Sequence, residues 1–210
     1  MHFSAFLTFP VLVFIWYQIQ NYLYNTIAHK TFKISRNFVS AIHATTVIFS
    51  YLVGIPGYIL LHLSITYYIM DSMYELMNLL WPEKPNRKIT IYDLGMLLHH
   101  VICITVLTQF THPTVEYHVF RAFFLSEVSN MPMYLVYHLK GVKYMNTNMI
   151  KFIIAIEALG YIVLRLIIGG KITYDMWFEK DISSFVFTSA ILILIISAVW
   201  TNKLIRQLLI

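Results

Sequence analysis

Seven long apolar segments recur along the chain, and short polar or turn-forming stretches separate most of them. Each segment is about twenty residues long, the length that a helix needs to cross a hydrocarbon layer of roughly 30 Å. They cover residues 3–24, 37–54, 57–80, 92–111, 117–138, 149–169 and 182–202. We therefore predict an all-α, polytopic membrane protein with about seven transmembrane helices, forming a single domain over residues 1–210.

The amino-acid composition argues against a water-soluble globule. Hydrophobic residues make up 59% of the 210 residues and charged residues 12%, whereas a soluble domain is about half apolar and about a quarter charged. The net charge of +5 does not indicate nucleic-acid binding, because the basic residues form short clusters between the apolar segments. The single cysteine, Cys103, can form neither an intrachain disulfide nor a zinc site, and we expect no metal site.

Turn-forming residues predict several helix ends. Gly54, Pro56 and Gly57 predict a tight turn between the second and third segments. Gly169 and Gly170 predict the end of the sixth segment.

Basic residues alternate between the two ends of the predicted helices. If the helices alternate in direction, successive loops lie on opposite faces of the membrane. One face then has only Lys171 and Lys180, and the other has eleven basic residues: Lys30, Lys33, Arg36, Lys84, Arg87, Lys88, Lys140, Lys143, Lys151, Lys203 and Arg206. Because basic loops stay in the cytosol, we predict a cytosolic C-terminus and an N-terminus on the lumenal or external side. Residues 3–24 have no basic leader or small-residue cleavage pattern, so we expect a retained helix rather than a signal peptide.

Ionisable residues interrupt the apolar segments, and such residues are functional candidates because a charge inside a membrane is costly. At helical spacing, Ser64, Tyr67, Tyr68, Asp71 and Glu75 form one polar stripe on the third segment. Other segments repeat this spacing: Ser40 with His43, His99 with Cys103, Glu127 with Asn130, and Glu157 with Tyr161 and Arg165.

The ionisable residues among these lie in the same half of the membrane. At about 1.5 Å per residue from the cytosolic helix ends, Asp71 and His100 lie roughly 13 Å deep, Glu157 about 11 Å, His43 about 9 Å and Glu127 about 18 Å. This pattern predicts a polar chamber in the cytosolic half of the membrane.

Structural roles remain alternatives for some of these residues. A lone intramembrane histidine often forms a hydrogen bond between helices, Glu157 and Arg165 could form an ion pair, and Arg121 fits a side chain that snorkels to the lumenal edge. Packing alone explains the adjacent His99 and His100 less well.

Five short motifs occur in the order found in the TLC domain family, which the chain resembles over residues 36–170. Arg36–Ala44 resembles the family's R-x-x-x-S-x-x-H-A segment, and Ser64–Asp71 its S-x-x-Y-x-x-x-D segment. His99-His100 is similar to its double histidine, Glu127–Pro132 to a segment with Glu, Ser and Pro, and Arg165 to an arginine late in the next helix.

The resemblance implies six helices forming a barrel around a lipid cavity, one helix packed outside, and a location in the endoplasmic reticulum or a related endomembrane. Among the family's ceramide synthases, it implies that the histidines transfer an acyl group from acyl-CoA to a sphingoid amine. Glu127 and Asn130 replace the two aspartates of the synthases' H-D-x-x-D element, and no homeobox-like segment is present. The chain therefore resembles the small, domain-only members more closely.

Two functions fit these observations. The first is an acyltransferase that moves an acyl group from acyl-CoA, as co-substrate, to a lipid amine or hydroxyl; the second is a non-catalytic protein that binds, senses or traffics a lipid. Both involve membrane lipids as partners, without nucleic acid or a tightly bound cofactor. The catalytic candidates are His99, His100, Asp71 and Glu127, and the substrate-binding candidates are His43, Ser64, Tyr67, Tyr68, Glu75, Cys103, Asn130, Glu157 and Arg165.

Within the double histidine, we predict that His100 is the working residue. It shares a helix face with Asp93 and should lie level with Asp71, whose carboxylate would fix the imidazole tautomer.

Overall fold

The computed structural model describes residues 3–26, 32–80, 90–109, 113–139 and 146–209, and these form seven continuous helices with no strand among them. The prediction of an all-α fold is thereby confirmed. The helices are α1 (Phe3–Thr26), α2 (Phe32–Leu52), α3 (Gly57–Leu80), α4 (Ile91–Thr108), α5 (Pro113–Leu139), the uninterrupted run of α6 (Thr147–Gly160), η1 (Tyr161–Ile168) and α7 (Gly169–Trp177), and α8 (Ser184–Leu209).

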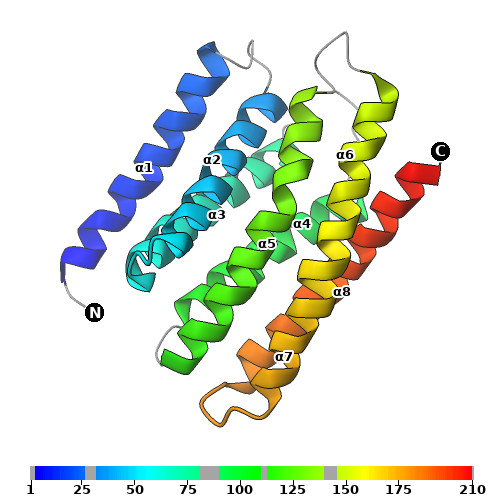
Figure 1. Ribbon diagram of the computed structural model, residues 1–210. Coiled ribbons are helices and arrows are strands. Elements are labelled where there is room, and N and C mark those ends of the chain that lie inside the picture. The colour runs from blue at the N-terminus through cyan, green and yellow to red at the C-terminus, as the bar shows by residue number, and fades with distance from the viewer. Residues whose placement is uncertain (1–2, 27–31, 81–89, 110–112, 140–145, 210) are drawn as a thin grey trace.

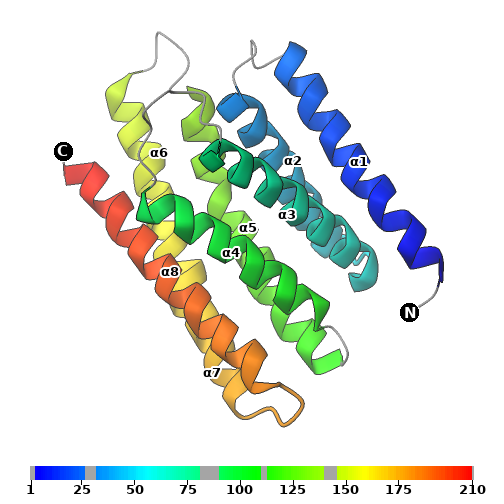
Figure 2. The same ribbon diagram turned by 180° about the vertical axis from the view of Figure 1, so that it is seen from behind.

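Successive helices run in opposite directions, so that the two termini lie at opposite ends of the bundle (Figure 1). Contacts between neighbours close a ring of six helices: α2 packs on α3, α3 on α4, α4 on α8, α8 on α6, α6 on α5, and α5 back on α2. Helix α1 lies outside this ring against α2 and α3, which is visible from both sides of the molecule (Figure 2).

In the described part of the chain, two side-chain hydrogen bonds attach α1 to the ring. The indole Nε1 of Trp16 donates to the carbonyl oxygen of Leu63 on α3 at 3.2 Å, and the amide of Gln20 donates to Ser35 Oγ on α2 at 2.6 Å. Both Trp16 and Gln20 are buried. One face of α1 is therefore fixed against the ring, while Phe14 and Tyr22 are exposed on its outer side.

The predicted turn between α2 and α3 is present. Gly54 adopts a left-handed backbone with φ of 70°, which a residue with a Cβ tolerates poorly. Ile55 N–H donates to Ser50 O at 2.9 Å and Gly54 N–H donates to Tyr51 O at 3.3 Å, the pair of bonds that defines a Schellman cap.

The predicted helix end at Gly169 and Gly170 is wrong, because the chain continues as a helix to Trp177. Gly169 has right-handed helical angles, φ of −62° and ψ of −38°. A glycine inside a helix costs only about 1 kcal/mol relative to alanine, and the following turns bury Ile172, Thr173 and Met176. That burial explains why the helix does not stop at the glycines.

Large apolar side chains cover much of the outer surface. In the described part of the chain, two helices are long and apolar enough to cross a bilayer, Thr147–Trp177 and Ser184–Leu209. Only 39% and 22% of their most apolar windows are buried, whereas the core helix of a soluble protein is mostly buried. These two helices indicate association with a membrane.

Candidate functional site

A buried ion-pair cluster joins α2, α3 and α4. The guanidinium of Arg36 donates to Asp71 through Nε at 2.5 Å and through Nη2 at 2.9 Å, and its Nη1 binds Glu75. Asp71 and Glu75, one helical turn apart on α3, are both buried. His100 Nε2 lies 3.3 Å from the second oxygen of Asp71, so one carboxylate contacts both a guanidinium and an imidazole.

His43 occupies the centre of a second polar group between α2, α3 and α5. Its Nε2 lies 3.1 Å from Ser64 Oγ, and its Nδ1 lies 3.7 Å from Glu127 Oε1. The imidazole stacks on the Tyr67 ring with centroids 3.9 Å apart. The Tyr67 hydroxyl in turn donates to Ser40 Oγ at 2.8 Å. These contacts hold a fully buried histidine in one orientation.

Arg165 joins the sixth helix to α5. Its Nε donates to Ser129 Oγ at 2.6 Å, and its Nη2 donates to Asn130 Oδ1 at 2.7 Å and to the carbonyl oxygen of Ser126 at 2.9 Å. The guanidinium also lies 4.2 Å from the centroid of the Tyr161 ring. The remaining nitrogen, Nη1, is buried and has no hydrogen-bond partner in the described structure.

The segment that bears Arg165 is a π-helix, Tyr161–Ile168. Such helices account for well under 1% of residues and recur at functional sites. The wider turn changes the angular register between α6 and α7, so it decides which side chains of this helix face α5 and α8. The apolar sequence of the segment gives no sign of it.

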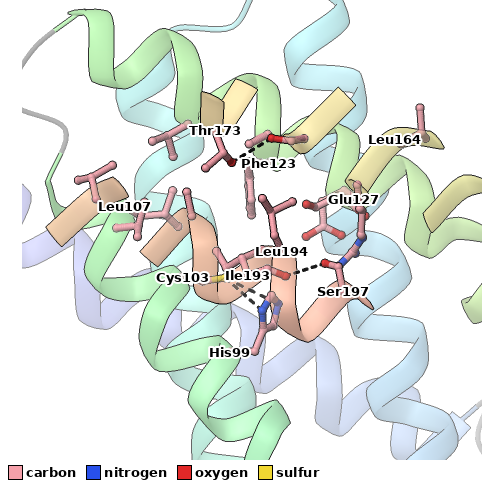
Figure 3. A pocket seen from close by; sticks show the side chains of 18 of the residues that line it. His99, Cys103, Leu107, Phe123, Glu127, Leu164, Thr173, Ile193, Leu194 and Ser197 are labelled. Carbon is pink, nitrogen blue, oxygen red and sulfur yellow. Dashed lines mark hydrogen bonds between the residues drawn. The ribbon is translucent and has the colours of Figure 1, made fainter. Parts of the chain in front are cut away.

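A cavity of about 90 Å³ lies inside the helix ring, between α3, α4, α5, η1, α7 and α8. One part of its wall is polar and comprises Tyr68, His99, Cys103, Ser126, Glu127, Asn130, Arg165 and Ser197. The other part is mainly apolar and comprises Val106, Leu107, Val119, Ala122, Phe123, Leu164, Gly169, Thr173, Met176, Val186, Ala190, Ile193 and Leu194. Figure 3 shows His99, Glu127 and Ser197 on one side of the cavity and Leu107 on the other.

The polar and apolar parts are separated along the helix axes. On α8, the apolar wall starts at Val186 and the polar wall lies at Ser197, roughly 16 Å further along the helix. On α4, His99 belongs to the polar part and Leu107 to the apolar part. The cavity is therefore amphipathic and elongated parallel to the bundle.

The two adjacent histidines have different surroundings. His99 lines the cavity, with its ring nitrogens 3.7 and 3.9 Å from Cys103 Sγ and its centroid 5.5 Å from that of Trp200 on α8. His100 instead contacts Asp71 on α3. Adjacent residues on a helix point about 100° apart, which explains the division. The side chain of Asp93, the other expected neighbour of His100, lies outside the described residues.

The structure divides the predicted site residues between the cavity wall and the polar groups beside it. Tyr68, His99, Cys103, Glu127, Asn130 and Arg165 line the cavity. His43, Ser64, Tyr67, Asp71, Glu75, His100 and Glu157 are not among the lining residues. We expected Asp71, His43, Glu127 and one of the two histidines, His99 or His100, to line one internal cavity. His99 and Glu127 do line it, but Asp71 and His43 contact other polar side chains between the helices instead.

Tyr68 and Glu127 connect the cavity wall to the His43 group. The Tyr68 hydroxyl donates to Glu127 Oε1 at 3.1 Å, and the same oxygen faces His43. The second oxygen, Oε2, is buried without a hydrogen-bond partner in the described structure. Glu127 is thus shared between the two regions.

Sequence reasoning missed several contributors to the site. Arg36 appeared only as a loop charge and a motif residue, although its spacing to Ser40 and His43 places all three on one face of α2. On α8, Trp200 and Ser197 were missed because neither belongs to a repeated polar pattern in the sequence. Within the described residues, no group of three or more His, Cys, Asp and Glu side chains is arranged to hold a metal ion.

No protein-family model, curated protein or solved structure matches the chain.

Proposed function

We propose that all seven helices span a membrane, with the N-terminus on the lumenal or external side and the C-terminus in the cytosol. Large exposed apolar side chains on every helix support this, among them Phe14, Phe49, Met77, Leu98, Leu135, Phe152 and Ile195. Exposed apolar surface of this extent is typical of contact with lipid. The alternation of Lys and Arg between helix ends supports the orientation.

We propose further that the protein is a small, domain-only member of the TLC domain family, resident in the endoplasmic reticulum or a related endomembrane. Its motif residues support this because they gather in the ring interior: Arg36, Ser40, His43, Ser64, Asp71, Glu127 and Arg165 all form contacts between helices. A ring of six helices with α1 outside is also the arrangement that the resemblance implies.

We propose that the protein is a lipid-binding protein whose cavity holds one acyl chain with its head group near His99 and Glu127, and that the helix ring widens on binding, because the cavity of about 90 Å³ is smaller than such a ligand. The observation that supports this is the amphipathic cavity, because an acyl chain with a polar end needs an apolar wall that leads to a few polar groups. In this account the Arg36–Asp71–His100 cluster fixes the three helices around the cavity and does not touch the ligand.

Native mass spectrometry of the purified protein tests this function. We expect one retained lipid per chain in the wild type and its loss in Ala190→Phe, which fills the apolar part of the cavity. The matched control is Ala155→Phe, because Ala155 is exposed on the outer side of α6. Equal lipid occupancy in the wild type and in Ala190→Phe would refute the proposed site.

Acyl transfer is the second candidate, and the position of His99 beside Cys103 in the cavity wall favours it. The imidazole would take the acyl group from acyl-CoA, with cleavage of the thioester C–S bond and release of CoA as the thiol, which carries away the imidazole proton. An amine or hydroxyl of the acceptor lipid would then attack the acyl carbon and return a proton to His99. A covalent acyl adduct that is lost in His99→Ala and kept in His100→Ala would favour this function over binding alone.

The geometry supports binding better than transfer. Within the described residues His99 makes no hydrogen bond to a carboxylate, whereas His100, which does contact one, lies outside the cavity lining. A catalytic histidine is usually oriented by such a group.

A further inference from the structure

Three amide side chains form a row on the outer face of α1, away from the helix ring. Gln18, Asn21 and Asn25 are all exposed, whereas the opposite face of the same helix buries Trp16 and Gln20. Exposed amides are ordinary in water, but a helix that spans a membrane turns such a face toward lipid. This amide row therefore needs a partner.

Hydrogen bonds within α1 satisfy only part of the amide row. The Nδ2 atom of Asn25 donates to the carbonyl oxygen of Asn21 at 2.9 Å and to its Oδ1 at 3.0 Å. In the described structure, no hydrogen bond is formed by the amide of Gln18, by Nδ2 of Asn21 or by Oδ1 of Asn25. Both donors and acceptors thus remain on this face.

The amide row extends into the proposed hydrocarbon layer. Helix α1 has 24 residues, so it is about 36 Å long and exceeds a layer of about 30 Å by about one turn. Centred in that layer, it places Asn25 near the cytosolic interface and Asn21 and Gln18 roughly 5 Å and 9 Å inside. Hydrocarbon offers these amides no hydrogen bond, and amides in membranes commonly bind across helices.

The exposed residues of α1 also follow a seven-residue repeat. Val11, Phe14, Gln18, Asn21 and Asn25 are separated by three, four, three and four residues, and all five are exposed. This is the spacing of the a and d positions in a left-handed coiled coil, the geometry in which most membrane helices pack. The outer face of α1 therefore has the periodicity of a helix-packing seam.

The chemistry of the amide row favours a second copy of the same chain as the partner. An amide carries both donors and an acceptor, so two identical amides can bind each other, whereas two identical charges would repel. All copies enter the membrane with the same orientation, so two α1 helices meet in parallel. A twofold axis along the membrane normal then brings each residue of the seam opposite its own counterpart.

We propose that two copies of the chain dimerise through the outer face of α1, with Gln18, Asn21 and Asn25 each bound to its counterpart across a parallel, left-handed helix pair. This rests on the proposed membrane orientation and is independent of the lipid cavity. The helix ring of each copy stays outside the contact, because α1 lies between the ring and the partner (Figure 2).

Disulfide cross-linking in native membranes tests the register of this dimer. In a chain with Cys103→Ser, Phe14→Cys places a thiol in the seam and keeps all three amides. Tyr17→Cys is the matched control, because Tyr17 is also exposed on α1 but lies to one side of the seam. A disulfide needs Cα atoms within about 7 Å of each other, so mild oxidation should link Phe14→Cys chains and leave Tyr17→Cys chains mostly unlinked. Equal linking of the two, or none at Phe14→Cys, would overturn the proposal.

Single-molecule photobleaching of the labelled protein in vesicles of defined phospholipids tests the role of the amides. We expect the wild type to be mainly dimeric and the double variant Gln18→Leu, Asn21→Leu to dimerise about tenfold more weakly. Asn202→Leu, at an exposed amide of α8, is the matched control and should dimerise like the wild type. Thermal unfolding verifies that each variant is folded.

Two results of the photobleaching experiment would overturn the proposal. Leucine keeps the seam apolar, so unchanged dimerisation of the double variant would show that the amides do not hold the contact. A monomeric wild type would show that this face binds a different protein or only lipid, because the vesicles contain no other chain. A failure of the membrane orientation itself is detected separately, since cysteines placed at Ser4 and Gln207 would then be labelled from the same side.

Discussion

Arg36 binds Asp71 through two hydrogen bonds, Nε to Oδ1 at 2.5 Å and Nη2 to Oδ2 at 2.9 Å, and thereby joins α2 to α3. The third guanidinium nitrogen binds Glu75 on the same face of α3. Because Asp71 also contacts His100, a single arginine holds together the interface of three ring helices.

Arg36→Ala should destabilise the protein strongly, because it leaves two buried carboxylates without their cation. Breaking a buried pair on one side typically costs about 3 to 5 kcal/mol, and we expect a clear fall in the midpoint of thermal unfolding. Arg36→Lys should fall between the wild type and Arg36→Ala, since an ammonium cannot make the two-point contact with Asp71.

The control for this effect is Lys171→Ala, which removes an exposed pair with Asp175 on α7 and should change the midpoint little. The double variant Arg36→Ala, Asp71→Asn should lose less than the sum of the two single variants, because neutralising Asp71 removes one of the unpaired charges. An unchanged midpoint in Arg36→Ala would contradict the assignment of this cluster as structural.

Alanine variants of the two histidines should differ in their effects on stability and on ligand binding. His100→Ala removes a contact of Asp71 and should lower the thermal midpoint while leaving lipid occupancy of the folded protein unchanged. His99→Ala alters the cavity wall and should lower lipid occupancy with a smaller loss of stability. Native mass spectrometry and thermal unfolding on the same samples measure both quantities, and the reverse pattern would favour His100 as the ligand-contacting residue.

The π-helix should be necessary for the position of Arg165. Deletion of Val163, which faces outward from this segment, removes one residue from the wide turns and rotates the residues on one side of it by about 100° relative to those on the other. We expect the Arg165 contacts with α5 and the retained lipid to be lost together. Val163→Ala is the control and should keep both; a deletion variant that retains wild-type lipid occupancy would show that the register does not matter.

The proposed orientation in the membrane gives a prediction that does not depend on the cavity. Cysteines placed at Ser4 and at Gln207, in a chain with Cys103→Ser, should react with a membrane-impermeant thiol reagent from opposite sides of sealed vesicles. The Ser4 site should be labelled from the lumenal side and the Gln207 site from the cytosolic side. Labelling of both from one side would contradict a seven-span topology.

The sequence predicts the helices and their order well. It predicts less well which polar residues line the cavity and which lie in the polar groups beside it. Helical spacing correctly placed Asp71 and Glu75 on one face of α3, and Gly54 and Pro56 marked a real turn. The contacts of Arg36 were missed because a long side chain at a helix end can reach a partner one helix away, which spacing within one segment cannot reveal.

The lining of the cavity could not be predicted from the sequence, because it depends on packing between helices that no local sequence pattern encodes. Helical spacing placed His100 level with Asp71, which it contacts, but only the packing of α8 against α4 decides that His99 is the histidine that lines the cavity. The π-helix likewise left no signal in the apolar segment that contains Arg165, and Gly169 and Gly170 suggested an end where burial of Ile172 and Met176 continues the helix.

The most direct measurement of the central proposal is to map where a bound acyl chain lies. A fatty acid that bears a photoreactive diazirine at the end of its chain is bound to the protein and irradiated, and the labelled peptides are identified by mass spectrometry. We expect labelling of the apolar wall, at Leu107, Val119, Met176 or Val186, and its suppression in Ala190→Phe but not in Ala155→Phe. Labelling confined to the exposed outer faces of the helices, unchanged by Ala190→Phe, would contradict an acyl chain inside the ring.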